Sequence, residues 1–342
     1  MDKRVIFAVA GSGKTTFIID NLNYEKRTLL VTYTIENYQT LRRKISIKFG
    51  CIPENITIYT YFQFLYQYCI RPLLGYSANI RGIDWKASPP QRTSKSNERH
   101  YLTNERRLYH NRMAKLLIES NSMNEVCERI EKYFDLFCVD EVQDFAANDF
   151  NFLMAVCQAN LEILFVGDFY QHTFDTSRDG NTRGNLHKDY EKYKAEFQGV
   201  GLHVDNETLV KSYRCSPQIC AFVTEKLGIA IESHRNDSTE LLAVDEEETA
   251  ITLFSDDGTV KLFYDLQSKY QCNSNNWGKS KGRDDYHDVC VVLNQTTQGL
   301  FEADKLTDLN PTTRNKLYVA LTRARGSVHL VPHSFYDSLK KD

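Results

Sequence analysis

The segment that most constrains the fold is a glycine-rich turn near the start of the chain. Residues 5–9 form a short apolar run typical of a buried strand, and residues 17–22 continue as a helix. The sequence AVAGSGKT occupies residues 8–15 between them. In a strand–turn–helix unit of this kind, the glycines let backbone N–H groups surround a phosphate, and the N-terminus of the helix favours negative charge. The turn therefore predicts an α/β domain with a phosphate-binding loop.

The side chains of this loop predict contacts with a nucleotide and a cation. We expect Lys14 to bind the β- and γ-phosphates and the Thr15 hydroxyl to hold Mg²⁺. The strict pattern has glycine where Ala8 stands, and alanine fits there if its φ is negative. The alternative is a glycine-rich turn without a ligand, which the intact Gly-Lys-Thr disfavours. The predicted nucleotide contacts in this segment are Ala10, Gly11, Ser12, Gly13, Lys14, Thr15 and Thr16.

A pair of carboxylates follows a second buried run, at residues 134–139. The sequence DEVQD begins at Asp140, directly after this strand. Parallel sheets present their ligands at the carboxyl ends of strands. We expect Asp140 to hold Mg²⁺ through water, and Glu141 to orient and deprotonate the attacking water. The alternative is a solvated acidic turn, which is the weaker interpretation beside a phosphate-binding loop.

Strands and helices alternate along the whole chain. Residues 28–32, 55–59, 134–139 and 161–166 are expected as further strands, and residues 36–49 as a helix. A second series of strands is expected at residues 249–254, 289–293 and 328–331. This alternation predicts βαβ units and parallel sheets. A polar stretch at residues 176–206 separates the two series. We therefore predict domains at 1–205 and 206–342, the first with a short basic insertion at about 76–125.

The overall composition is that of a soluble globular protein. Hydrophobic residues make up 42% of the chain, and its formal net charge is −3. Any surface for nucleic acid must therefore be a local groove. The nine cysteines include no CxxC pair, which predicts reduced core cysteines rather than a zinc site. Since the chain runs from Met1 directly into a strand and has no long apolar span, we expect a cytoplasmic protein without a signal peptide.

Several more motifs follow in order. They are VGDFYQ at 166–171, KSYR at 211–214, GKSKG at 278–282 and YVALTRAR at 318–325. Together with the phosphate-binding loop and DEVQD, this series resembles that of superfamily 1 helicases, in the UvrD/Rep branch. The resemblance implies an α/β fold of two tandem RecA-like P-loop NTPase domains with parallel sheets. It also implies an ATP hydrolase that uses Mg²⁺ and moves on single-stranded DNA, with RNA left open as a partner.

The resemblance implies roles for further residues. Gln171 would sense the γ-phosphate and couple it to the nucleic-acid groove, and Tyr213 would stack on the adenine. Arg214 and Arg323 would supply positive charge to the γ-phosphate when the two domains close on ATP. The implied catalytic set is Lys14, Glu141, Gln171, Arg214 and Arg323, and Gly282 and Asp284 would lie near the nucleotide sugar and phosphates.

The resemblance also implies a nucleic-acid groove. Its predicted contacts are Tyr33, Thr34, Thr60, Tyr61 and Phe174. Stacking on an aromatic ring contributes about 1–3 kcal/mol per base without sequence preference. The alternative for Tyr33 and Tyr61 is core packing. The basic stretch from Arg81 to Lys115 is interpreted equally well as a phosphate-binding surface or as a solvated helix and loop.

The sequence departs from the family pattern in three ways. The phosphate-binding loop begins at residue 8, so the family's upstream glutamine motif has no place and nucleotide selectivity is open. The family has a further tryptophan shortly after the position of Phe174, and this sequence has none there. The large inserted subdomains are absent or short, which makes this a compact form. Two functions are therefore compared: a motor on single-stranded nucleic acid, and an ATP-dependent switch or accessory subunit of a nuclease or defence complex.

Overall fold

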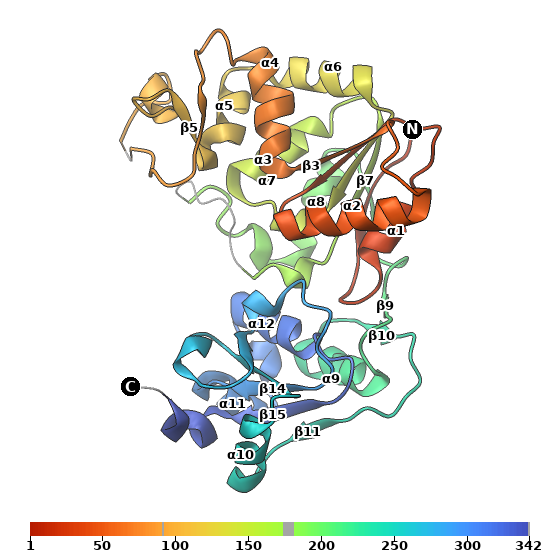
Figure 1. Ribbon diagram of the computed structural model, residues 1–342, viewed down its shortest axis with the longest axis vertical. Coiled ribbons are helices and arrows are strands. Elements are labelled where there is room, and N and C mark those ends of the chain that lie inside the picture. The colour runs from red at the N-terminus through yellow and green to blue at the C-terminus, as the bar shows by residue number, and fades with distance from the viewer. Residues whose placement is uncertain (91, 174–180, 341–342) are drawn as a thin grey trace. The chain divides into compact units, whose positions relative to one another are not determined.

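The computed structural model describes residues 1–90, 92–173 and 181–340 (Figure 1). The contacts within the chain divide it into two compact units. Unit 1 comprises Met1–Ile6, Lys14–Gly167 and Asp175–Asp205, and unit 2 comprises Phe7–Gly13, Asp168–Phe174 and Asn206–Asp342. Most of the phosphate-binding loop therefore groups with the C-terminal half of the chain, whereas Lys14 begins the main segment of unit 1.

Unit 1 is built on a six-stranded sheet in the order β3-β2-β6-β7-β1-β8. The central strands β2 and β6 are buried at every position and pair in parallel, as expected for strands covered on both faces. β2 also pairs in parallel with β3, β6 with β7, and β1 with β8. The strands are β1 (Lys3–Phe7), β2 (Thr28–Thr32), β3 (Ile56–Thr60), β6 (Leu136–Asp140), β7 (Glu162–Gly167) and β8 (His203–Asp205).

The helices of unit 1 begin where strands end. Thr34 caps the N-terminus of α2 by accepting a hydrogen bond from the Asn37 N–H at 3.2 Å. Thr60 and Gln63 form a reciprocal capping box at the start of α3. The helices are α1 (Lys14–Asp20), α2 (Ile35–Phe49), α3 (Tyr61–Gln63), the π-helix η1 (Phe64–Ile70), α4 (Arg71–Leu73), α5 (Met113–Glu119), α6 (Met123–Tyr133), α7 (Ala147–Val156) and α8 (Tyr190–Gly199).

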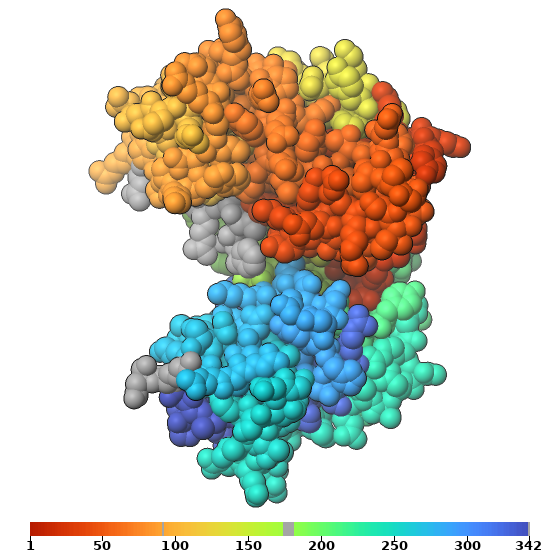
Figure 2. All heavy atoms as spheres, viewed as in Figure 1, coloured from red at the N-terminus to blue at the C-terminus, as the bar shows by residue number. Residues whose placement is uncertain are grey.

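The segment predicted as an insertion contains a small sheet of its own. β4 (Gly82–Asp84) and β5 (Arg107–Tyr109) pair in parallel, with the 3₁₀ turn η2 (Glu98–His100) between them and η3 (His110–Arg112) after them. Within this segment, Tyr101 and Leu108 are buried. In the space-filling view, its orange and gold atoms form a large part of the visible surface of unit 1 (Figure 2).

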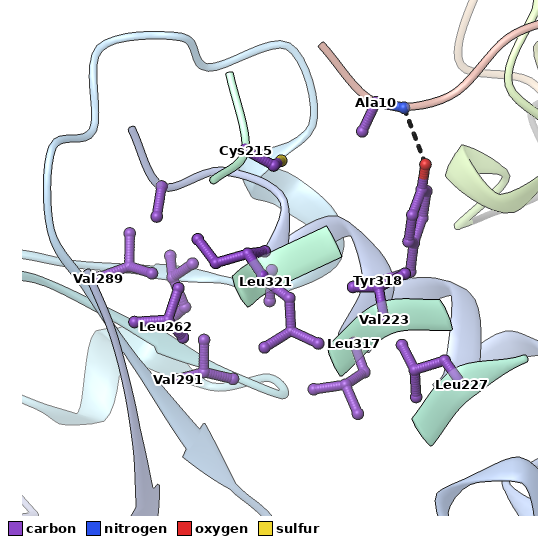
Figure 3. Packing of buried hydrophobic residues seen from close by; sticks show 14 of the residues in the cluster. Ala10, Cys215, Val223, Leu227, Leu262, Val289, Val291, Leu317, Tyr318 and Leu321 are labelled. Carbon is purple, nitrogen blue, oxygen red and sulfur yellow. Dashed lines mark hydrogen bonds between the residues drawn. The ribbon is translucent and has the colours of Figure 1, made fainter. Parts of the chain in front are cut away.

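Unit 2 contains a five-stranded parallel sheet in the order β11-β15-β14-β12-β13. Its strands are β11 (Leu241–Ala243), β12 (Val260–Phe263), β13 (Ser274–Asn276), β14 (Val289–Leu293) and β15 (Val328–Pro332), and β9 (Lys211–Ser212) and β10 (Glu232–Ser233) form a separate pair. The helices are α9 (Pro217–Leu227), α10 (Glu247–Ser255), α11 (Gln295–Glu302) and α12 (Pro311–Leu321). Side chains from α9, α12 and the sheet form one buried core (Figure 3).

One strand prediction in unit 2 is wrong. Residues 249–254 were expected as a strand, but they lie in helix α10, and the strand that follows is β12. Ala250 is buried, and Leu253 and Phe254 pack against the same cluster. These three residues stand at positions i, i+3 and i+4, which lie on one face of a helix. In a short apolar run, this helical spacing is hard to distinguish from a buried strand.

None of the helices in the described ranges is both long enough and apolar enough to cross a membrane.

Candidate functional site

The glycine-rich turn of unit 2 packs closely against the segment that follows β9. Gly11 and Gly13 have φ values of +71° and +87°, the left-handed region that favours glycine. A Cβ atom at Gly11 would lie 2.7 Å from Arg214 Cβ and 2.7 Å from Ser212 Oγ. The Tyr213 N–H donates to the Gly11 carbonyl at 2.9 Å. The turn is therefore held beside Arg214 by a contact that no larger residue at position 11 would permit.

A buried tyrosine links three of the sequence motifs within unit 2. The Tyr318 hydroxyl accepts a hydrogen bond from the Ala10 N–H at 2.8 Å (Figure 3) and donates to Asp168 Oδ2 at 3.0 Å. Asp168 Oδ1 accepts from the Tyr170 N–H at 3.1 Å. Burial raises the pKa of Tyr318 well above its usual value, so the hydroxyl keeps its proton. The YVALTRAR motif begins with Tyr318, but the sequence alone predicts no role for this residue.

Replacing Tyr318 with Phe should weaken ATP binding by about tenfold, because the turn loses a buried hydrogen bond that fixes Ala10. We also expect the free energy of unfolding to fall by about 1–3 kcal/mol. Tyr336→Phe is the matched control, because it removes a buried hydroxyl of unit 2 that donates to the Ala250 carbonyl at 2.9 Å. Calorimetric titration of both variants with ATP should separate them; equal affinities would contradict the positioning role.

Unit 1 brings together four of the predicted site residues. Lys14 Nζ lies 3.9 Å from Glu141 Oε1, and the Thr15 hydroxyl donates to Asp140 Oδ2 at 3.3 Å. Asp140 is 2% exposed. Burial, and then the charge of Glu141, raise the pKa of Asp140 to about 7, against the opposing effects of Lys14 and Thr15. A cation beside Asp140 would favour its ionised form.

These oxygens suit a Mg²⁺ ion. Asp140 Oδ1 is buried and has no hydrogen-bond partner among the atoms of the described residues. A carboxylate and a hydroxyl are the hard oxygen ligands that Mg²⁺ prefers, and such ions usually take their other ligands from phosphates and water. Within 1–90, 92–173 and 181–340, no group of three or more His, Cys, Asp or Glu side chains is placed to bind a metal. A cation held by Thr15 and Asp140 would take its remaining ligands from phosphate and water.

The backbone at Glu141 adopts a conformation that is costly for this residue type. Its φ and ψ are 58° and 52°, and strain of this kind costs about 1–3 kcal/mol. Gln143 Nε2 donates to Glu141 Oε2 and so fixes its carboxylate. A Cβ atom at Gly167 would overlap Gln143 Oε1 and lie 2.8 Å from Val142 Cγ1. Gly167 thus leaves room for the side chain that orients Glu141, a role that sequence reasoning gave to neither residue.

Gly167→Ala should lower the free energy of unfolding by about 1–3 kcal/mol, because the new methyl group displaces Gln143 and Val142. Turnover of ATP should fall as Glu141 loses its fixed orientation. Gly199→Ala, at the end of α8, is the control, because a Cβ atom there meets nothing within 4 Å. Thermal unfolding and ATPase rates of the two variants should differ; a Gly167 variant as stable and active as the control would contradict this packing.

The two arginines predicted to act on the γ-phosphate, Arg214 and Arg323, have unsatisfied donors within unit 2. Arg214 donates from Nη1 to the Thr322 carbonyl at 3.0 Å and pairs through Nη2 with Asp284. Arg323 is buried and donates to the carbonyls of Val319 at 3.1 Å and Arg283 at 3.3 Å. Arg214 Nε and Arg323 Nη2 are buried without a partner among the described atoms. Burial and the charge of Arg214 lower the pKa of Arg323 to about 10, so a nearby anion would stabilise both groups.

The other predicted nucleotide contacts of unit 2 differ in exposure and in their partners. Tyr213 is 63% exposed and stacks on His234 with ring centroids 3.9 Å apart, so one face of its ring is covered. Asp284 is the ion-pair partner of Arg214, and Gly282 has a φ of +82°. Gln171 is buried in η5 (Phe169–Gln171). Adenine stacking and phosphate sensing by these residues stay predictions.

Two predicted loop residues differ in exposure. Ser12 is buried and donates to the Val9 carbonyl at 2.9 Å, which closes the turn. Thr16 is exposed on α1. Ala8 does not have a positive φ, which meets the condition for alanine at this position.

The predicted nucleic-acid residues of unit 1 cluster at the carboxyl ends of β2 and β3. Tyr33 and Tyr61 stack with centroids 5.4 Å apart, and both hydroxyls donate to the carboxylate of Asp149, at 3.2 and 3.1 Å. Tyr61 is 1% exposed, which favours the core-packing alternative for this ring. Thr34 and Thr60 serve as helix caps. Phe174 lies outside the described residues.

The basic stretch from Arg81 to Lys115 has mixed roles. Arg112 is buried against His100, Arg106 pairs with Glu98, and Lys95 pairs with Glu119. These three side chains serve the structure of the segment. Besides Lys95, the exposed members are Arg81, Lys86, Arg92, Arg99 and Arg107.

Comparison with known proteins finds similar structures but no match at the level of sequence. A scan against protein-family models found no match, and neither did a search of the curated proteins. The structure of the arterivirus nonstructural protein 10 helicase with DNA matches with a TM-score of 0.53 and 12% identity, over 96% of this chain and 60% of that chain. A crystal structure of the same helicase matches with a TM-score of 0.52 and 12% identity, over 99% and 62%. The chain has a helicase-type fold.

The predicted fold class is confirmed by this match and by the two parallel sheets. The α/β architecture of the helicase-type fold consists of two RecA-like domains. The chain spans about 60% of the length of the arterivirus helicase chains.

Proposed function

We propose that the protein hydrolyses ATP and couples hydrolysis to movement along single-stranded nucleic acid, as a helicase or translocase of superfamily 1, in the UvrD/Rep branch. One observation carries this proposal. The turn that holds Gly11 beside Arg214 leads within three residues to Lys14, whose ammonium group lies 3.9 Å from Glu141. Along the chain, a phosphate-binding backbone thus leads directly to a basic residue that lies, within unit 1, beside a base for water.

Each residue has a defined task in the proposed hydrolysis. Glu141 accepts a proton from the attacking water, whose oxygen forms a bond to the γ-phosphorus. The bond from that phosphorus to the β–γ bridging oxygen breaks, which yields ADP and inorganic phosphate. Lys14, Arg214 and Arg323 offset the negative charge that develops on the phosphate oxygens. Bound Mg²⁺, held by Thr15 and Asp140, would supply further charge neutralisation.

Single-stranded DNA is the partner that we favour. The arterivirus helicase with the same fold was solved with DNA, and unit 1 has exposed aromatic and basic side chains in the segment from Arg81 to Lys115. Exposed arginine and lysine side chains bind phosphates without regard to sequence. RNA is tested as the other arm of the same experiment.

The test measures ATPase rate with no nucleic acid, with single-stranded DNA and with RNA, and then strand displacement on a tailed duplex. A motor should show a stimulated rate and displacement. Stimulation without displacement would favour the ATP-dependent switch or accessory subunit, for example of a nuclease. A protein that hydrolyses no ATP under any of these conditions would refute the proposal.

A further inference from the structure

We propose that Trp85, with Phe62 and His110 behind it, forms a platform in unit 1 on which an unpaired base of a single-stranded nucleic acid stacks. The proposal rests on the proposed function and extends it, because neither the motif series nor the comparisons assign Trp85 a role. It adds an element of the insertion to the nucleic-acid surface.

The pairing of β4 with β5 brings Trp85 and His110 together. β4 and β5 pair in parallel with Asp84 opposite Tyr109, so the next residue of each strand, Trp85 and His110, emerges at the same edge. Their rings stack with centroids 5.9 Å apart and an interplanar angle of 23°. Asp84 fixes the turn after β4, because its Oδ1 accepts hydrogen bonds from the N–H groups of Lys86 and Ala87 at 2.9 and 2.8 Å.

The platform continues the aromatic row that contains the predicted contacts. Phe62 meets Trp85 edge to face at 5.0 Å, and Tyr33 meets Phe62 at 5.7 Å. Tyr33 in turn stacks on Tyr61. Exposure rises along this row from 1% at Tyr61 to 55% at Trp85. The row is therefore anchored in the core at one end and offers a large open ring at the other.

An unpaired base is the occupant that suits this surface. A tryptophan held by neighbouring rings loses little freedom when a base stacks on it, and every base offers a π-face. Three exposed basic residues belong to this strand pair or adjoin it: Lys86 follows Trp85 in the chain, Arg81 precedes β4, and Arg107 begins β5. They are available for contacts to the phosphates of a bound strand. A stable apolar protein contact would have less use for the charged side chains of this strand pair.

Intrinsic fluorescence provides a direct test. The chain has two tryptophans, and Trp277 is 0% exposed with its indole N–H bonded to the Leu262 carbonyl at 2.8 Å. Quenching by a bound base should therefore report on Trp85. We expect a 20-nucleotide oligo(dT) to quench the fluorescence of the unsubstituted protein, and oligo(dT) binding by Trp85→Phe to proceed without that quenching.

Affinity is measured in parallel by anisotropy of labelled oligo(dT) and oligo(rU). Trp85→Ala should bind the preferred oligonucleotide about 5- to 150-fold more weakly, and Trp85→Phe should retain most of the affinity. Tyr76→Ala is the matched control, since Tyr76 is a fully exposed aromatic residue of the same insertion. Its affinity should be unchanged, and thermal unfolding should show that all variants are folded.

The outcomes separate this proposal from the proposed function. If Trp85→Ala binds both oligonucleotides as tightly as the unsubstituted protein and no quenching occurs, the platform is refuted while the motor stands. If the unsubstituted protein binds neither oligonucleotide, both proposals fail. If oligo(rU) alone binds and quenches, the platform is supported and its ligand is RNA.

Discussion

Glu141→Gln should lower ATP turnover by about 10²–10⁴-fold, the range typical of losing a general base. Gln143 fixes the carboxylate, and Lys14 lies 3.9 Å away, so the amide can occupy the same position without accepting a proton. ATP binding should be retained or strengthened, because the substitution removes a negative charge near the phosphates. Single-turnover hydrolysis and binding of a fluorescent ATP analogue measure the two effects separately.

Glu162→Gln provides the control for this substitution. Glu162 is a carboxylate of β7 in the same unit, and it pairs with Lys26 at 2.6 Å. We expect its loss to leave turnover unchanged, because a partly exposed ion pair contributes little. Unchanged turnover in the Glu141 variant would refute its role as the base. Loss of ATP binding in that variant would instead place Glu141 in nucleotide binding.

The parts of the fold that the sequence predicts well are those determined by local pattern. β2 and β6 are continuous apolar runs that stay buried at every position, and the glycine-rich turn follows β1 as expected. Residues 249–254 mislead because β-branched and aromatic residues also suit a helix that packs on one face, as α10 does. A short apolar run alone does not distinguish the two periods.

The parts of the site that the sequence does not predict depend on contacts between distant residues. The hydrogen bond between Ala10 and Tyr318 joins positions 308 residues apart. Gly167 matters only because Gln143 lies against it. Asp284 was predicted as a nucleotide contact, but its ion pair with Arg214 was not. The role of Trp85 could likewise not be predicted from the sequence, because its place beside His110 follows from the pairing of β4 with β5. No local pattern encodes such pairings.

Arg323→Lys should lower ATP turnover by about 10³–10⁵-fold, the range known for arginine fingers, while ATP still binds. Lysine keeps the positive charge but lacks the planar fork that donates to the Val319 and Arg283 carbonyls while leaving Nη2 free for a phosphate oxygen. Because Arg323 is buried, its loss also threatens the fold, so thermal unfolding must accompany the kinetics.

Arg214→Lys keeps this prediction testable if the Arg323 variant does not fold. Arg214 is less deeply buried, and its Nε also lacks a partner among the described atoms. The same kinetic signature is expected: ATP bound, turnover greatly reduced. Arg283→Lys is the matched control, because Arg283 is exposed and pairs with Asp285 at 2.6 Å. If both folded variants hydrolyse ATP at the rate of this control, the charges needed at the γ-phosphate come from elsewhere. The assignment of unit 2 to catalysis would then be wrong.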